Sequence, residues 1–186
     1  MSIIKVGHSP VSESIMTESA NQFSGKQYMV HLLRTTQQQH ARLTGMADQK
    51  ANILIGASLI LLTFLSSQLF DGRVNPPFIA LATTSTIAGI FAIMVLMPRV
   101  KPVSTTDENF NLLFFGHFAG LTLEDFHARM KQTIADEDQT YVAMIHDIYG
   151  QGRLLEKKYR YLKYSYQVFL AGWILAFILY LVGTFR

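Results

Sequence analysis

MADQKANILIG, residues 46–56, decides the fold, because two charged side chains are followed without a break by an apolar run. Asp48 and Lys50 are the last charged residues before residues 51–70, which carry no formal charge. At about 1.5 Å rise per residue, a helix of this length spans a bilayer core of roughly 30 Å. The sequence therefore predicts that the chain enters a membrane at Ala51.

The composition is that of a small membrane protein. The chain has 186 residues, of which 49% are hydrophobic, and a net charge of +3. Lysines and arginines beside membrane spans explain the basic charge better than nucleic-acid binding does, so no nucleic-acid partner is expected. The absence of cysteine excludes disulfides, thiolate catalysis and cysteine zinc sites. No signal peptide is expected, because the first apolar run begins only at Ala51.

The N-terminal part is predicted to consist of a tail and one long helix. Residues 1–24 are rich in Ser, Thr and Glu without periodicity, which is typical of a flexible tail. Residues 25–50 have a polar helical pattern and are predicted to form a cytoplasmic helix starting near Gly25. No proline or glycine pair interrupts the chain before Phe70, so this helix should continue directly into the first span, residues 51–70.

A second span should follow a short turn. Residues 71–77 contain one glycine, one asparagine and two prolines, which predicts a turn between antiparallel spans. Residues 78–97 are again uncharged and form the predicted second span. Its small residues Ala88 and Ala92, four apart, either let another helix approach closely or are ordinary filler.

Residues 98–163 are predicted to form a helical cytoplasmic domain. A helix start is expected at residues 106–109. Residues 110–118 are too short to span, and could be a core helix, a helix on the membrane surface or part of a ligand pocket; core packing is favoured. Thr122 should cap another short helix. Its apolar positions recur at helical spacing: Leu123, Phe126, Met130 and Ile134.

The last helix is predicted to start at Asp136 and to run into the third span, residues 164–185. Gly150 and Gly152 are the point at which it could bend. Its apolar positions alternate at spacings of four and three, the coiled-coil period, which predicts one packing face and a homo-oligomer. These positions are Tyr141, Ile145, Ile148, Gly152, Leu155, Tyr159, Leu162, Tyr166, Phe169, Trp173, Ala176, Tyr180 and Gly183.

Positive charges predict the topology. The hairpin loop carries only Arg73, which is balanced by Asp71, whereas residues 1–50 and 98–163 are rich in lysine and arginine. The positive-inside rule therefore places the N-terminus and the helical domain in the cytoplasm and the C-terminus outside. The predicted fold class is an all-α membrane protein with three transmembrane helices, in which two long helices continue from the cytoplasm into the membrane.

Motifs for catalysis are scarce. There is no phosphate-binding glycine loop, no Gly-x-Ser-x-Gly and no His-Glu-x-x-His, so no catalytic residue, metal site or cofactor is expected. His146 and Asp147 form the dipeptide of HD phosphohydrolases without the further metal ligands those enzymes need. His117 and His127 could converge with His146, although ordinary polar histidines are favoured. The acidic residues 136–138 most simply stabilise a helix N-terminus.

Charges at the membrane boundary are the most unusual feature. Asp48 and Lys50 are two apart, so on a helix they point to nearly opposite sides and each needs a partner on another helix. An Asp48 bridge to Lys158 or Arg160 is geometrically plausible, the alternative being that all are interfacial anchors. Tyrosines interleave with these cations, which suits a nucleotide base and phosphate or an aromatic belt equally well.

These residues resemble the transmembrane effectors of Pycsar antiphage systems. The resemblance lies in Asp48-x-Lys50-Ala51, in residues 111–116 (NLLFFG), in the helix containing Asp147 and in Lys158-Tyr159 before the last span, and it covers residues 26–183. It implies an effector that responds to cyclic CMP or cyclic UMP, made by a partner cyclase, by impairing the inner membrane so that infection is aborted. It implies no enzymatic activity and an inner-membrane location.

The resemblance implies the ligand, and the cluster of cations and tyrosines predicts that it binds between the two long helices. The phosphate would lie among Arg153, Lys157, Lys158 and Arg160, and the base against Tyr149 or Tyr159. Asp48 and Lys50, at the membrane boundary, would transmit ligand binding to the packing of the membrane spans. The competing interpretations are a nucleotide-independent pore or transporter subunit and a membrane-bound phosphohydrolase.

Cysteine labelling in intact cells tests the topology. Because the chain has no cysteine of its own, Asn75→Cys should react with an impermeant thiol reagent from outside, and Lys131→Cys should react only after the cells are opened. The reverse pattern would contradict the assigned orientation.

Overall fold

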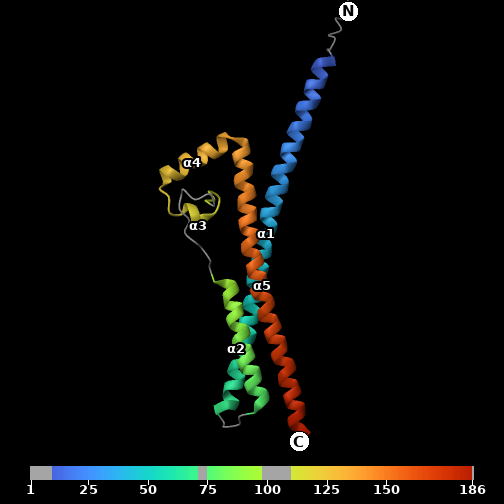
Figure 1. The fold of residues 1–186 in the computed structure, drawn as a ribbon, viewed down its shortest axis with the longest axis vertical. Coiled ribbons are helices and arrows are strands. Elements are labelled where there is room, and N and C mark those ends of the chain that lie inside the picture. Colours follow the sequence, from blue (N-terminus) through green and yellow to red (C-terminus); the bar gives the residue numbers. More distant parts are fainter. Residues whose placement is uncertain (1–9, 71–74, 98–109, 186) are drawn as a thin grey trace, which may run out of the picture.

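The computed structural model describes residues 10–70, 75–97 and 110–185, with side chains from residue 25 to 67 in the first helix. Within these ranges the chain forms five helices and no strand (Figure 1). They are α1 (Pro10–Phe70), α2 (Pro76–Leu96), α3 (Phe115–Phe118), α4 (Leu123–Ala135) and α5 (Glu137–Thr184). Three of them, α1, α2 and α5, are long and apolar enough to cross a membrane, which confirms the predicted fold class.

The helix α1 begins at Pro10, so the predicted start near Gly25 was wrong by fifteen residues, and most of the proposed tail is helical. Proline is favoured at the first helical position, and one glycine inside a helix costs only about 1 kcal/mol relative to alanine. With 61 residues, α1 is about 90 Å long at 1.5 Å per residue. The helix α5 likewise runs unbroken through Gly150 and Gly152.

The helix α2 also begins earlier than expected, at Pro76 rather than residue 78. Both prolines lie in its first turn, where the missing N–H groups would have no intrahelical partner. Asn75 precedes them with extended backbone, at φ −92° and ψ 130°. The prolines that marked the turn therefore start the second span.

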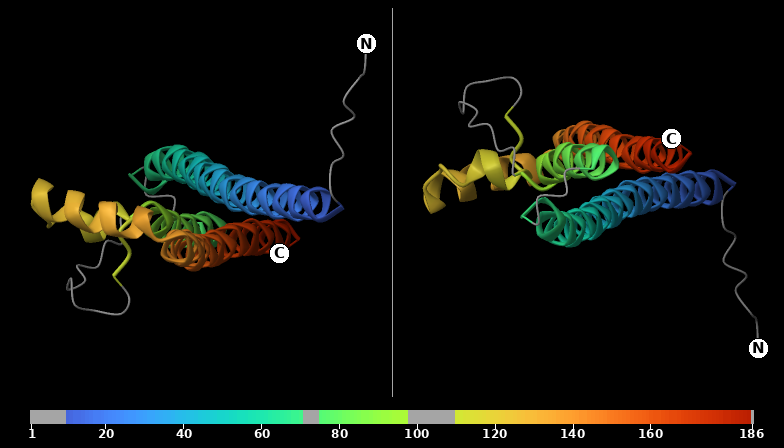
Figure 2. Two further views of the ribbon diagram at one scale, coloured as in Figure 1. Left: turned by 90° about the horizontal axis from the view of Figure 1, so that it is seen from above. Right: turned by 90° about the horizontal axis from the view of Figure 1, so that it is seen from below.

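The three long helices pack side by side through small and branched side chains (Figure 2). Ala88 and Ala92 of α2 are completely buried, which confirms that they form a packing face rather than filler. The buried positions on each helix follow spacings close to four and three. They are Ala47, Ala51, Leu54, Ser58 and Leu65 of α1, Leu81, Ser85, Ala88, Ala92 and Val95 of α2, and Leu162, Ser165, Gly172 and Ala176 of α5.

The buried face of α5 differs from the predicted stripe. Leu162 and Ala176 belong to both, but Tyr166, Trp173 and Tyr180 are exposed at 41%, 48% and 61%. A strict 3.5-residue repeat drifts by about 20° per heptad around a straight α-helix. Over the six heptads of the stripe this amounts to about 120°, so the stripe cannot stay on one face of a straight α5.

Two contacts show how closely α2 and α5 approach. The Ser165 hydroxyl donates a hydrogen bond of 2.5 Å to the backbone oxygen of Ala88. A Cβ atom at Gly172 would overlap the Thr84 side chain, so only glycine fits there. Small residues that permit such approach are the usual means of helix association in lipid.

The short elements lie beside the polar end of α5 (Figure 1). Thr122 caps α4 by accepting from the Asp125 N–H, and Asp136 caps α5 by accepting from the N–H groups of Asp138 and Gln139, both as predicted. The apolar side chains of α4 are only partly buried by the rest of the protein, because Leu123 and Ile134 are largely exposed.

Residues 110–118 form mostly turns, with one helical turn at α3. Leu112 is buried, whereas Phe115 is exposed. Core packing therefore applies to Leu112 and not to the segment as a whole. The helix start expected at residues 106–109 lies outside the described residues.

Replacing Gly172 by alanine should destabilise the bundle, because the new methyl group must displace Thr84 or separate α2 from α5. We expect a loss of about 1–3 kcal/mol, seen as a lower thermal midpoint in detergent by circular dichroism. Gly183→Ala, in the same helix with open space around it, is the matched control and should change little. Equal midpoints for the two variants would contradict this packing.

Candidate functional site

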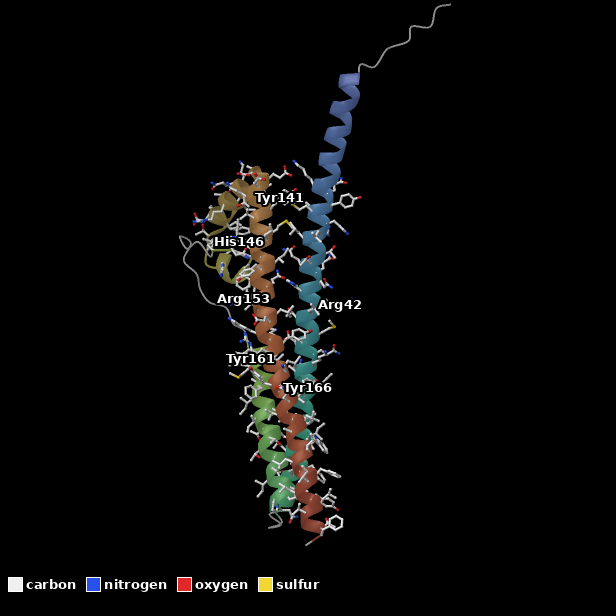
Figure 3. All side chains as sticks on the ribbon, turned by 45° about the vertical axis from the view of Figure 1, so that its right-hand side comes forward. Arg42, Tyr141, His146, Arg153, Tyr161 and Tyr166 are labelled. Atoms are coloured by element: carbon white, nitrogen blue, oxygen red, sulfur yellow. The ribbon has the colours of Figure 1, made fainter. Side chains whose placement is uncertain are left out.

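The polar parts of α1 and α5 lie side by side (Figure 3), and three contacts between side chains connect them there. Their positions are separated by 11 and 11 residues in α1 and by 10 and 11 in α5. Three turns of an α-helix contain about 10.8 residues, so the contacts lie along one line between two parallel helices. They join Lys26 to Glu137, Gln37 to Asp147 and Asp48 to Lys158, at 2.6, 2.9 and 2.6 Å.

The Asp48–Lys158 ion pair confirms the bridge considered from the sequence. The two side chains are only 35% and 25% exposed, and Ala47, Ala51 and Leu162 pack closely around this level. Arg160, the other candidate, instead pairs with Glu156 of its own helix at 3.1 Å. The ion pair thus fastens α1 to α5 at the point where the apolar run begins.

Asp147 is the centre of a buried hydrogen-bond network. It is 4% exposed and accepts from three side-chain amides: Gln37 of α1 at 2.9 Å, Asn111 at 3.1 Å and Gln151 at 2.6 Å. Asn111 also accepts from the Leu113 N–H at 2.9 Å, which shapes the turn. We call Gln37, Asn111, Asp147 and Gln151 the Asp147 network. It joins α1, α5 and the segment before α3.

Sequence reasoning singled out Asp147 only as part of a dipeptide and as a point of resemblance. The dipeptide is divided in the structure, because His146 is exposed on the side of α5 nearest α4 while Asp147 is buried against α1 (Figure 3). The His117 ring accepts a hydrogen bond from the Asn111 N–H at 2.9 Å. In the described part of the chain, no three His, Asp or Glu side chains are grouped so as to hold a metal ion.

The residues expected to bind a nucleotide do not converge. Arg153 and Arg160 both pair with Glu156, and Tyr149 is 68% exposed. The Tyr159 hydroxyl points toward α1 and donates to the Leu43 carbonyl at 3.4 Å. The cationic cluster is therefore spread around α5.

Lys157 and Lys158 line a partly open pocket. It is a cavity of about 260 Å³ between the end of α2, the segment before α3 and α5, with mostly apolar walls. Phe114, Phe115 and Tyr161 contribute aromatic rings to it. Lys50 lies elsewhere, with Tyr159 and Lys163 beside a shallow groove between α1 and α5.

A more polar cavity of about 370 Å³ lies between α4, α5 and the segment 110–112. Its lining includes Phe110, Arg129 and His146 together with side-chain amides. The Arg129 guanidinium lies over the Phe110 ring, 5.5 Å from its centroid. The sequence indicated His146 through the dipeptide and residues 110–112 as part of a possible ligand pocket. It did not indicate that α4 contributes to the same cavity, because the walls come from three separate segments.

The outermost contact of the α1–α5 pair depends on charge. The hydrogen bond from Lys26 lowers the pKa of Glu137, with a second contribution from the Tyr141 hydroxyl, and the same bond raises the pKa of Lys26. The Lys26–Glu137 contact therefore contributes to the stability of the folded protein at neutral pH. It is lost as the pH falls through the lowered pKa of Glu137 or rises through the raised pKa of Lys26. Both side chains are well exposed, so this contact is the weakest of the three.

Comparison with known proteins identifies one family. The family model described as the Pycsar effector protein domain matches residues 31–184, which contain all but one side chain of the three α1–α5 contacts and the whole Asp147 network. No curated protein and no solved structure matches the chain.

Asp147→Leu should destabilise the junction of α1 and α5, because it leaves three partly buried amide donors without their acceptor. We expect a loss of about 3 kcal/mol or less, measured as a lower thermal midpoint, and a smaller loss for Asp147→Asn, which keeps one acceptor oxygen. Asp138→Asn, at an exposed position of the same helix, is the control. A midpoint for Asp147→Leu equal to that of the control would show that the network contributes nothing.

Proposed function

Because the chain belongs to the Pycsar effector family, we propose that it responds to a cyclic pyrimidine nucleotide by impairing the bacterial inner membrane. The nucleotide, cyclic CMP or cyclic UMP, comes from a partner cyclase that is active during phage infection. Loss of membrane integrity then aborts the infection. The effector acts by changing conformation, and no enzymatic step is proposed.

One observation carries this proposal: α1 and α5 pass from the polar half into the apolar half as single unbroken helices. Their three contacts lie in the polar half, and the Asp48–Lys158 ion pair lies where the spans begin. A ligand shifts a conformational equilibrium only through its different affinity for two states. A ligand that prefers another spacing of the two helices would therefore alter the packing of the spans.

The orientation follows from the positive-inside rule. It places the polar half, with residues 25–50 and 110–163, in the cytoplasm, where the nucleotide is made. The hairpin between α1 and α2 and the C-terminus then lie outside.

The effector is proposed to act as a homo-oligomer. Within one protomer, the α5 side chains Tyr166, Trp173 and Tyr180 remain exposed. Lipid or a second copy of the chain can cover them, and a membrane lesion formed from three-helix protomers requires several copies.

Two other functions predict different behaviour. A nucleotide-independent pore or transporter subunit would leak without any ligand. A membrane-bound phosphohydrolase would require His146 together with further metal ligands.

Purified protein in liposomes that hold a self-quenching dye tests the proposal. Cyclic CMP or cyclic UMP should release the dye, and cyclic AMP should not. Asp48→Lys should abolish the ligand-dependent release, because it places two like charges together at the start of the spans. The double variant Asp48→Lys/Lys158→Asp restores an ion pair and should recover the release.

Two outcomes would argue against the proposed function, and a third against the role of the ion pair. Release without nucleotide supports the pore, and hydrolysis of a phosphodiester that His146→Ala abolishes supports the enzyme. Ligand-dependent release that Asp48→Lys leaves intact shows that the ion pair does not transmit the signal.

A further inference from the structure

The polar cavity between α4, α5 and residues 110–112 has the chemistry of an anion site. Arg129 and His146 bring N–H donors to it, and none of the described residues that line it is acidic. No described carboxylate pairs with Arg129, whose guanidinium lies against the Phe110 ring. A guanidinium offers paired N–H donors that match two oxygens of a phosphate, and stacking on an aromatic ring holds its plane.

The same cavity carries groups suited to a planar base. Gln132 of α4 and Gln139 of α5 both line it, and a side-chain amide supplies two N–H donors and an acceptor. One N–H of Gln139 donates to Asp136 at 3.0 Å, which leaves its second N–H and its oxygen for a ligand. Phe110 adds apolar surface to the lining, although the Arg129 guanidinium lies over its ring and the His117 ring centroid is 5.9 Å away. Its volume of about 370 Å³ lies at the lower end of the usual range for small-molecule sites. This combination fits a small mononucleotide better than inorganic phosphate alone.

The cavity is connected to the contact between α1 and α5. Asn111 lines it and also donates to Asp147, which accepts from Gln37 of α1. The Asn111 N–H is in addition fixed by His117. A ligand that moves Asn111 would therefore remove or reorient one of the three donors to Asp147, and the hydrogen bond from α1 would adjust.

We propose that this cavity binds the cyclic pyrimidine nucleotide, with Arg129 and His146 contacting the phosphate and Gln132 and Gln139 facing the base. The inference rests on the proposed function and places its ligand away from the cationic cluster of Arg153, Lys157 and Arg160. The signal then reaches the spans through Asn111, the Asp147 network and α1.

Equilibrium dialysis of the purified full-length protein in detergent, with radiolabelled cyclic CMP or cyclic UMP, tests the site. Arg129→Ala should weaken binding about tenfold to hundredfold, the usual effect of losing a hydrogen bond to a charged group. His146→Ala should weaken it as well. Lys131→Ala, which removes an equal charge from α4 outside the cavity lining, is the matched control and should bind normally. Excess inorganic phosphate should compete poorly.

The possible failures are distinguishable. If the unaltered protein binds neither nucleotide, the proposed function fails and this site with it. If the unaltered protein binds but Arg129→Ala and His146→Ala bind equally well, only the site is wrong, and loss of binding in Lys157→Ala or Arg153→Ala would then locate it on the cationic cluster. Hydrogen exchange provides a second measurement: nucleotide should change the protection of residues 31–44 in the unaltered protein but not in Asn111→Ala. The same change in both would refute the route through Asn111.

Discussion

The close approach of α2 to α5 is the constraint on which the rest of the structure depends. In a bilayer the hydrophobic effect does not hold helices together, so they associate through packing and interhelical hydrogen bonds. Gly172 against Thr84 and the bond from Ser165 to the Ala88 carbonyl leave little freedom to slide or rotate. Because α1 packs on the same two helices, the register set in the apolar half also determines which residues meet in the polar half.

That register explains the line of contacts between α1 and α5. Once the helices are parallel and nearly straight, partners recur after about three turns, and Lys26, Gln37 and Asp48 each meet a polar group of α5. The contacts differ in strength. The outer one is exposed, the inner one is partly shielded at the start of the apolar run, and the central one joins a half-buried amide to the buried Asp147 carboxyl group. An α1–α5 pair of this kind can separate at its outer end while remaining fastened at the membrane boundary.

The Asp147 network joins three segments of the chain through hydrogen bonds from neutral donors. Its carboxyl group is surrounded by three neutral amides and no described cation pairs with it, so each bond can be exchanged for another without leaving an opposite charge unpaired. One of the three donors, Asn111, also borders the polar cavity, and another, Gln37, belongs to the helix that enters the membrane first. All four residues of the network lie within the part of the chain that matches the Pycsar effector family.

The sequence alone determined the all-helical class, the three long apolar helices and the caps at Thr122 and Asp136, because each depends on local composition and spacing. It also restricted the partner of Asp48 to two cations at the same depth. Tertiary structure decided the rest. A proline can mark a turn, but it is also compatible with the first turn of a helix. Pro10 and Pro76 therefore start helices where a tail and a turn were expected. The face that α5 buries could not be identified, because a 3.5-residue stripe stays on one side only if the helices supercoil. The polar cavity as a whole could not be identified either, since Phe110, Arg129 and His146 lie on three separate segments that come together only in the folded chain (Figure 1).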